Sequence, residues 1–332
     1  MKTIDIHAHV VPDSLWKAID AKRDWHGFRH EAGEGLGAMM GGGMRTAFTS
    51  PKLRYGVAER LKDMDAQKVD VQVLSIHTPF VGYHLEAAQG LALAREFNDE
   101  LGATVRGNPG RLAGLATLPV QDVKSAIDEL ERAVTKLGMK GASLDTQVNG
   151  EQWDEPKFVP FFKAAEQMGA VLFYHPQPQN NFLMQRIRRH GLSNSLGVIL
   201  DDAIVVGVLI CGGVLEKCPD LKVCIAHGGG PACYAMGRLD RNWNERPATR
   251  STPKPPGAYQ KKLYYDTVVP SEEALRFLID RVGVDRVVLG SDWPFVAWDG
   301  SPVKWLQGLK SLTAEEKEKV LWKNLATLLD IR

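Results

Sequence analysis

Short apolar segments alternate with amphipathic segments along almost the whole chain. The apolar segments are rich in β-branched residues, as in the run from Val69 to Ile76, and this composition is typical of strands. The amphipathic segments are longer and carry apolar residues at helical spacing, as from Glu86 to Val105. We predict eight strands, at residues 3–9, 69–76, 111–117, 140–144, 170–175, 221–227, 263–266 and 286–292. We predict helices at residues 55–67, 86–105, 123–137, 158–168, 198–211, 231–243, 272–282 and within 304–329.

This alternation indicates an α/β fold. The predicted strands are apolar on both faces, which is the pattern of a parallel sheet covered by helices. Eight strand–helix units favour a closed (β/α)₈ TIM barrel over an open doubly wound sheet, and no G-x-G-x-x-G follows the first strand. We therefore predict one barrel domain over residues 1–332. Its small N-terminal insertion, residues 12–55 after strand one, is Gly-rich and is predicted to be an irregular active-site loop.

Composition narrows the class of protein. Hydrophobic residues make up 44% of the 332 residues, charged residues 24%, and the formal net charge is +1, so nucleic acid is not an expected partner. No uninterrupted apolar run reaches about 18 residues and no leader precedes the first strand, so neither a membrane partner nor a signal peptide is expected. The four cysteines lie within residues 211–233 without a C-x-x-C motif, which suits reduced thiols in a cytoplasmic enzyme.

Histidines gather at the predicted strand ends. His7 and His9 lie two apart in the first strand, so they should project from the same face. His175 ends the fifth strand, His227 the sixth, and Asp292 the eighth. Because the active site of such barrels lies at the carboxyl ends of the strands, we expect these side chains to meet. Three neutral imidazoles and one carboxylate suit Zn²⁺ or Mn²⁺.

His227 is followed by three glycines, which let the backbone bend sharply and leave the imidazole accessible. We interpret it as an acid or base beside the metal, which leaves His7, His9, His175 and Asp292 as ligands. A His-Gly-Gly-Gly run could also form the oxyanion loop of a lipase, but the G-x-S-x-G nucleophile motif is lacking.

Together these motifs resemble the amidohydrolase superfamily, and more narrowly its branch around 2-amino-3-carboxymuconate 6-semialdehyde decarboxylase. The resemblance spans nearly the whole chain. It rests on His7-Ala8-His9, His175-Pro176, His227-Gly228-Gly229-Gly230 and Gly290-Ser291-Asp292-Trp293-Pro294, with Met64-Asp65-Ala66-Gln67 and Gly237-Arg238-Leu239-Asp240 in support.

The resemblance implies a role for each residue. His7, His9, His175 and Asp292 would bind one divalent metal, usually zinc and in some members manganese, and His227 would act on the metal-bound water. Arg45 is similar in place to an arginine that grips a substrate carboxylate. Arg238 matches an arginine that reaches into the neighbouring subunit's site, which implies a homodimer and a small carboxylate substrate.

One departure concerns the pocket wall. Where the decarboxylase has a Trp after the strand-five His-Pro, this chain has residues 177–181, Gln-Pro-Gln-Asn-Asn, so the substrate can differ. Trp293 could line the pocket, although plain packing explains it equally well.

The predicted activity is metal-dependent, non-oxidative decarboxylation of an unsaturated or aromatic carboxylic acid, such as a carboxymuconate semialdehyde or a hydroxybenzoate, in aromatic catabolism. His227 would move a proton, and the metal, held by Asp292 among its ligands, would stabilise the developing charge together with the arginines. The alternative is a hydrolase or hydratase of a ring-cleavage product that uses the same site. A non-catalytic metal-binding protein is the third hypothesis, and no residue pattern supports it.

Overall fold

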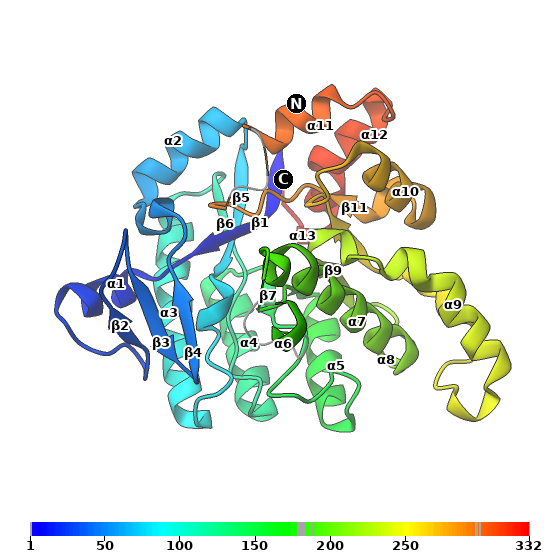
Figure 1. Cartoon of the computed structure of the whole chain (residues 1–332), viewed down its shortest axis with the longest axis horizontal. Helices are drawn as coiled ribbons and strands as arrows, with labels where there is room; N and C mark the ends of the chain where they lie inside the picture. The colour runs from blue at the N-terminus through cyan, green and yellow to red at the C-terminus, as the bar shows by residue number, and fades with distance from the viewer. Residues whose placement is uncertain (1, 178–183, 188, 296–297, 299, 332) are drawn as a thin grey trace.

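The computed structural model describes residues 2–177, 184–187, 189–295, 298 and 300–331. Eight parallel strands form its centre, with helices around them (Figure 1). These strands are β1 (Ile4–Val10), β5 (Val71–Ile76), β6 (Leu112–Gly114), β7 (Gly141–Leu144), β8 (Val171–Tyr174), β9 (Lys222–Ile225), β10 (Tyr264–Asp266) and β11 (Val287–Val288). All eight predicted strands are present, and most are shorter than predicted because the chain leaves the ladder before its apolar run ends.

The strands close into a barrel. Ladders join them in the orders β1–β5–β6 and β7–β8–β9–β10–β11. Two backbone hydrogen bonds connect the ladders: the Ala116 N–H donates to the carbonyl of Gly141 at 2.8 Å, and the Ile6 N–H donates to that of Leu289 at 3.0 Å. The second bond joins the last strand to the first, and the predicted (β/α)₈ barrel is confirmed.

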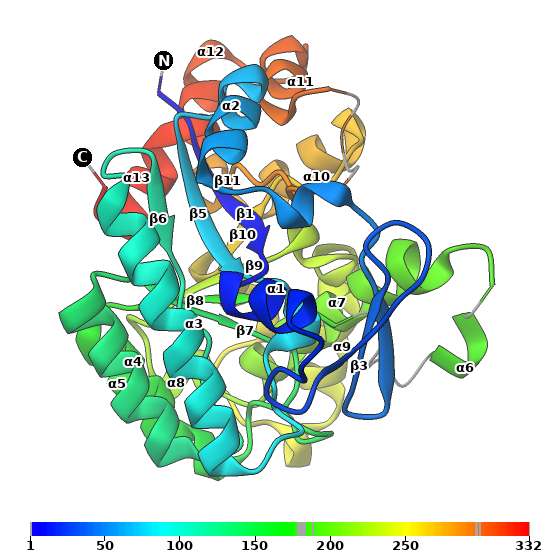
Figure 2. The ribbon, with the colours of Figure 1, turned by 90° about the vertical axis from the view of Figure 1, so that its left-hand side faces the viewer.

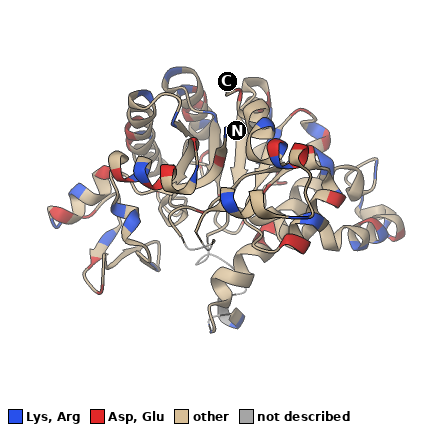
Figure 3. Ribbon diagram, turned by 90° about the horizontal axis from the view of Figure 1, so that it is seen from above, with Lys and Arg blue, Asp and Glu red and all other residues tan. Residues whose placement is uncertain are grey.

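Helices cover the barrel from outside, as Figure 2 shows from a second side. Amphipathic α4 illustrates why they form: the Asp122 side chain accepts the Ser125 N–H at 2.7 Å, and Gly138 ends the helix with a φ of 74°. The helices are α2 (Val57–Gln67), α3 (Ala87–Gly107), α4 (Val123–Leu137), α5 (Val159–Met168), α6 (Met184–Ile187), α7 (Val198–Cys211), α8 (Val214–Lys217), α9 (Ala232–Glu245), α10 (Glu272–Val282), α11 (Pro302–Gly308), α12 (Ala314–Glu318) and α13 (Asn324–Leu329). Acidic and basic residues are intermixed over these outer elements (Figure 3), in keeping with the near-zero net charge.

The insertion after β1 is more regular than predicted. It contains α1 (Asp13–Asp20) and an antiparallel sheet of β2 (Arg29–Glu31), β3 (Ala38–Gly41) and β4 (Met44–Ala47). Helix α1 buries Leu15 and Trp16. Gly42 and Gly43 both have positive φ, 58° and 74°, which suits the tight turn between β3 and β4. The prediction of an irregular loop was wrong because the glycines that close this hairpin were interpreted as a breakdown of structure.

One segment, Ser193–Cys211, is long and apolar enough to span a membrane by length and composition. It comprises a π-helical turn at Ser193–Gly197 and the whole of α7. Val205, Val206 and Leu209 of α7 are fully buried in the protein core. A core helix passes the same length and composition test, and α7 covers the barrel in this way.

A bulge in β1 aims the N-terminal histidines. Asp5 pairs with Gln72 and Ala8 with Leu74, so β1 advances three residues while β5 advances two. A bulge of this kind changes which side chains face inward. Ile4 and Ile6, before the shift, belong to the apolar filling of the barrel. His7 and His9, after it, face the carboxyl-terminal mouth.

Gly141 should be essential for packing β7 against β8. Its φ is 148°, and a Cβ would lie 1.9 Å from the carbonyl oxygen of Val171, which is backbone and cannot move aside. We expect Gly141→Ala to lower the free energy of unfolding by at least about 2–3 kcal/mol in urea denaturation. The matched control is Gly107→Ala in α3, where a Cβ would meet nothing within 4 Å. Equal stability of the two variants would contradict this account.

Candidate metal centre

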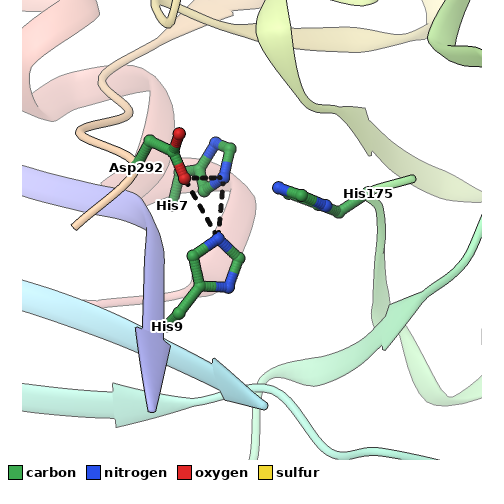
Figure 4. A group of neighbouring side chains, drawn as sticks. All are labelled: His7, His9, His175 and Asp292. Atoms are coloured by element: carbon green, nitrogen blue, oxygen red, sulfur yellow. Dashed lines mark hydrogen bonds and ion pairs between the residues drawn. The ribbon is translucent and has the colours of Figure 1, made fainter. Parts of the chain in front are cut away.

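Four side chains converge at the carboxyl-terminal mouth of the barrel (Figure 4). His7 and His9 come from β1, His175 directly follows β8, and Asp292 lies beyond β11. One potential ligand atom from each residue lies within 4.8 Å of all the others. The structure therefore brings together all four residues that the sequence assigns to a metal.

The distances within this cluster suit one shared cation. The Nε2 atoms of His7 and His9 are 3.2 Å apart, and Asp292 Oδ1 lies 3.3 Å and 3.2 Å from them. The ring of His175 stands nearly perpendicular to both other rings, with centroids 4.7 Å and 4.8 Å away. Three nitrogens and one oxygen that face a common point are a donor set of the kind that Zn²⁺ and Mn²⁺ accept.

Hydrogen bonds behind the rings fix their orientation. His7 Nδ1 lies 2.6 Å from Oδ2 of buried Asp266, and His175 Nδ1 lies 2.8 Å from the carbonyl oxygen of Pro176. Each bond leaves Nε2 directed at the cluster, as is usual for histidines that bind metals. His175 Nε2 is buried without a hydrogen-bond partner among the described residues. A metal bond would satisfy it, so these residues fit a divalent ion.

Asp266 was overlooked as a site residue in the sequence. It ends the predicted seventh strand, and the strand-end rule that found the histidines would have found it as well.

The ionisation of the cluster also favours a cation. Burial lowers the pKa of His175 well below its usual value, so this ring is neutral and able to bind metal. Burial opposes the charge on Asp292, but His7 and His9 hold the pKa of this carboxyl well below its usual range. Burial also opposes a proton on His7, yet Asp292 and Asp266 together raise the pKa of His7 to about 10. The carboxylates thus create a potential that stabilises positive charge at the cluster.

A buried polar network lies next to the metal ligands. Asp5 accepts the His7 N–H at 3.0 Å, the Ser291 N–H at 2.9 Å and the Ser291 hydroxyl at 2.6 Å. Gln72 donates to the same carboxylate at 3.1 Å, and Arg60 donates to the oxygen of the Gln72 amide at 2.8 Å. Asp5 thereby holds β1 and the chain after β11 in one register, because Ser291 directly precedes Asp292.

His227 stands beside the cluster. Its ring centroid is 5.2 Å from that of His7 and 4.9 Å from that of His175, and its Nδ1 lies 2.9 Å from Oδ2 of buried Asp202. Burial works against a proton on His227, but the Asp202 carboxylate outweighs it and raises the pKa of the imidazole. Asp202 escaped the sequence analysis because it lies inside the apolar run that forms α7.

The glycines after His227 are needed for close packing. Gly228 has a φ of 61°, and a Cβ on Gly230 would lie 1.9 Å from the carbonyl oxygen of Ile199. The sharp bend predicted after His227 is present.

The residues predicted to bind substrate are not members of the metal cluster. Arg45, on β4, has a half-exposed side chain that pairs with Glu31 at 2.8 Å, and no bond joins it to the cluster among the described residues. Arg238 lies exposed on α9. Trp293 is buried: its Nε1 donates to Asp63 at 2.5 Å, and the Arg60 guanidinium lies 3.8 Å from its ring. Its position against α2 favours packing over the predicted pocket-lining role.

Gln177 begins the stretch that departs from the family pattern. Its N–H and its side-chain amide both donate to Asp145, at 3.2 Å and 2.8 Å. Burial raises the pKa of Asp145 to about 6, although hydrogen bonds from Thr146 and Gln177 lower it. Gln177 therefore fixes the chain next to His175. Residues 178–181, the rest of the amide-rich segment, lie outside the described residues.

A family model described as amidohydrolase matches residues 4–331 of this sequence. The chain belongs to the amidohydrolase family. Among curated members, 2-amino-3-carboxymuconate-6-semialdehyde decarboxylase of Dictyostelium discoideum is 32% identical over 333 residues, covering 99% of this chain and 91% of the relative.

Solved amidohydrolase-type structures share the fold along its whole length. The 5-carboxyvanillate decarboxylase from Sphingomonas paucimobilis aligns with a TM-score of 0.84 and 26% identity, covering 100% of this chain and 99% of the other. A dihydroxybenzoic acid decarboxylase from Polaromonas, solved with manganese and 2-nitroresorcinol, aligns with a TM-score of 0.81 and 20% identity, covering 99% and 97%.

The ligand assignment predicts which variants lose metal. We expect His7→Ala and Asp292→Ala to lose the bound divalent ion on dialysis, because each removes one of four donors. Asp266→Asn should keep the ion but bind it about 10- to 100-fold more weakly, because it only orients His7. Metal content by elemental analysis and affinity by chelator competition measure both effects. His30→Ala, in the insertion, is the control, and full metal content in both ligand variants would refute the assignment.

Proposed function

We propose that this protein is a metal-dependent, non-oxidative decarboxylase that acts on an unsaturated or aromatic carboxylic acid. The observation that carries the proposal is the cluster of three imidazoles and a carboxylate beside a His227–Asp202 pair. Similarity along 99% of the chain to a decarboxylase of a carboxymuconate semialdehyde supports it. The related 5-carboxyvanillate decarboxylase extends the candidate substrates to aromatic acids.

In this proposal His7, His9, His175 and Asp292 hold one divalent ion. Zinc suits an imidazole-rich donor set, and manganese is the alternative because the Polaromonas structure contains it. When bound, the ion supplies a Lewis acid for an oxygen of the substrate. Asp266 and the carbonyl of Pro176 keep two of the imidazoles directed at it.

His227 would move the proton. Loss of CO₂ breaks a carbon–carbon bond and leaves an electron pair on the substrate carbon, which must take up a proton. With Nδ1 of His227 bonded to Asp202, Nε2 is the nitrogen left for the substrate. Asp202 stabilises the imidazolium before it donates, so its role is to position and charge His227.

Arg238 bears on the oligomeric state. We propose a homodimer in which this arginine reaches the partner's substrate carboxylate. Its neighbour on α9, Tyr234, is 82% exposed, and Leu196 of the π-helical turn and Ile204 of α7 are exposed as well. An exposed arginine close to exposed apolar side chains suits a subunit interface.

The four free cysteines fit the cytoplasm as the proposed location.

Trapping of CO₂ tests the proposed reaction. Metal-loaded protein should release one CO₂ for each substrate consumed from a panel of carboxymuconate semialdehydes, hydroxybenzoates and carboxyvanillates. His227→Ala should keep its metal and lose turnover by about 100-fold or more, because general acid–base catalysis is worth that much. Turnover without CO₂ would instead place the protein among hydrolases or hydratases with the same ligands.

Arg238→Ala should raise KM for the carboxylate substrate by about tenfold with a smaller change in kcat, because a guanidinium that grips a carboxylate already contributes to binding in the ground state. Arg241→Ala, on the same helix and paired with Glu245, is the matched control. Mixing Arg238→Ala with a His227→Ala subunit should restore one intact site per heterodimer. A protein that sediments as a monomer at assay concentration would exclude this arrangement.

A further inference from the structure

His77 directly follows β5, the strand beside β1. Its N–H donates to the carbonyl of Val10 at 2.9 Å, which fixes the backbone at the mouth of the barrel. Val71 and Val73 of β5 belong to the apolar filling of the barrel. Because side chains alternate along a strand, the inward series 71, 73, 75 continues to His77.

Aromatic rings surround His77 next to the metal cluster. Its ring centroid lies 5.8 Å from that of His9, 5.3 Å from that of Phe295 and 5.5 Å from that of Phe80. Phe295 in turn lies 5.7 Å from His9. His77 and Phe295 therefore form a wall beside a metal ligand, at a place where a flat substrate could stack.

The imidazole of His77 has no hydrogen-bonding partner among the described residues. Nδ1 is enclosed without a hydrogen bond, and the structure shows none for Nε2 within the described part of the chain. Among the other histidines of the mouth, His7, His175 and His227 each have a bonded Nδ1. His9 Nδ1 also has no partner among the described residues, but Nε2 of His9 lies in the metal cluster, whereas neither nitrogen of His77 does. Enclosed polar groups are nearly always paired, and neither the metal nor the proton transfer accounts for this one.

We propose that His77 binds substrate and selects for a hydroxyl group on the unsaturated acid. Nε2 of the imidazole, which is not enclosed as Nδ1 is, would hydrogen-bond that hydroxyl while the substrate ring packs against Phe295. This inference rests on the proposed function and narrows its substrates to hydroxy acids. A hydroxyl both donates and accepts, so it satisfies either tautomer of a neutral imidazole, whereas a carboxylate only accepts and is costly to enclose.

This interaction can be tested without turnover by a thermodynamic cycle that compares two ligands on the wild type and on a His77 variant. Calorimetry on manganese-loaded protein would give dissociation constants for 2-nitroresorcinol and for 2-nitrophenol, which lacks one hydroxyl. We expect the wild type to bind 2-nitroresorcinol more tightly than 2-nitrophenol. His77→Phe should reduce the ratio of the dissociation constant for 2-nitrophenol to that for 2-nitroresorcinol about five- to tenfold. His84→Phe, an exposed position on the same connection after β5, should leave the ratio unchanged.

A second pair of variants guards against a folding defect. His77→Gln keeps a donor and an acceptor and should retain part of the preference, whereas His77→Leu should lose it, with both proteins holding full metal. An unchanged ratio in His77→Phe, or a wild type that does not prefer the second hydroxyl, overturns the inference. If CO₂ is released while the ratio is unchanged, the decarboxylase proposal stands alone. If the ratio falls but no acid yields CO₂, the binding role stands without it.

Discussion

The closure of the barrel between β11 and β1 is the constraint on which the site depends. Asp292 comes from the end of the chain and His7 from its beginning, and they meet only because the last strand pairs with the first. Asp5 secures this seam by accepting hydrogen bonds from both sides of it. Burial raises the pKa of Asp5, and the hydrogen bonds from Ser291 and the His7 N–H offset that cost. The buried carboxylate of Asp5 therefore serves to place two metal ligands, His7 and Asp292.

The sequence was sufficient to predict the fold and the metal ligands for one shared reason. In a parallel barrel the carboxyl ends of all strands lie at the same mouth, so residues that end different strands in the sequence lie close together in space. His9, His175 and Asp292 were found in this way without any knowledge of the loops, and His7 was found because it lies two residues before His9 in the same strand. The bulge in β1 was not foreseen, although it decides that the histidines, and not Ala8, face inward.

The remaining site residues depend on contacts that no local pattern reveals. Asp202 lies in a helix with an apolar sequence, and only the packing of α7 on the barrel brings it to His227. Arg45 shows the opposite case. Its place in the sequence resembles that of a substrate-binding arginine, but the hairpin of the insertion pairs it with Glu31 instead. Trp293 follows a ligand in sequence, yet its ring turns to α2 because Arg60 and Asp63 offer it a stacking and a hydrogen-bonding partner.

The carboxylates of the site bear on how a substrate carboxylate would bind there. Asp5, Asp202, Asp266 and Asp292 surround the histidines, and a substrate carboxylate that entered this field would be repelled. A divalent ion is the largest local charge in such a site and reverses the sign of that field. A bound divalent ion would therefore favour the binding of a substrate carboxylate. The same reasoning suits a neutral His77 beside the metal ligand His9: where a bound ion would already balance the charge of the substrate, discrimination between substrates would depend on hydrogen bonds more than on charge.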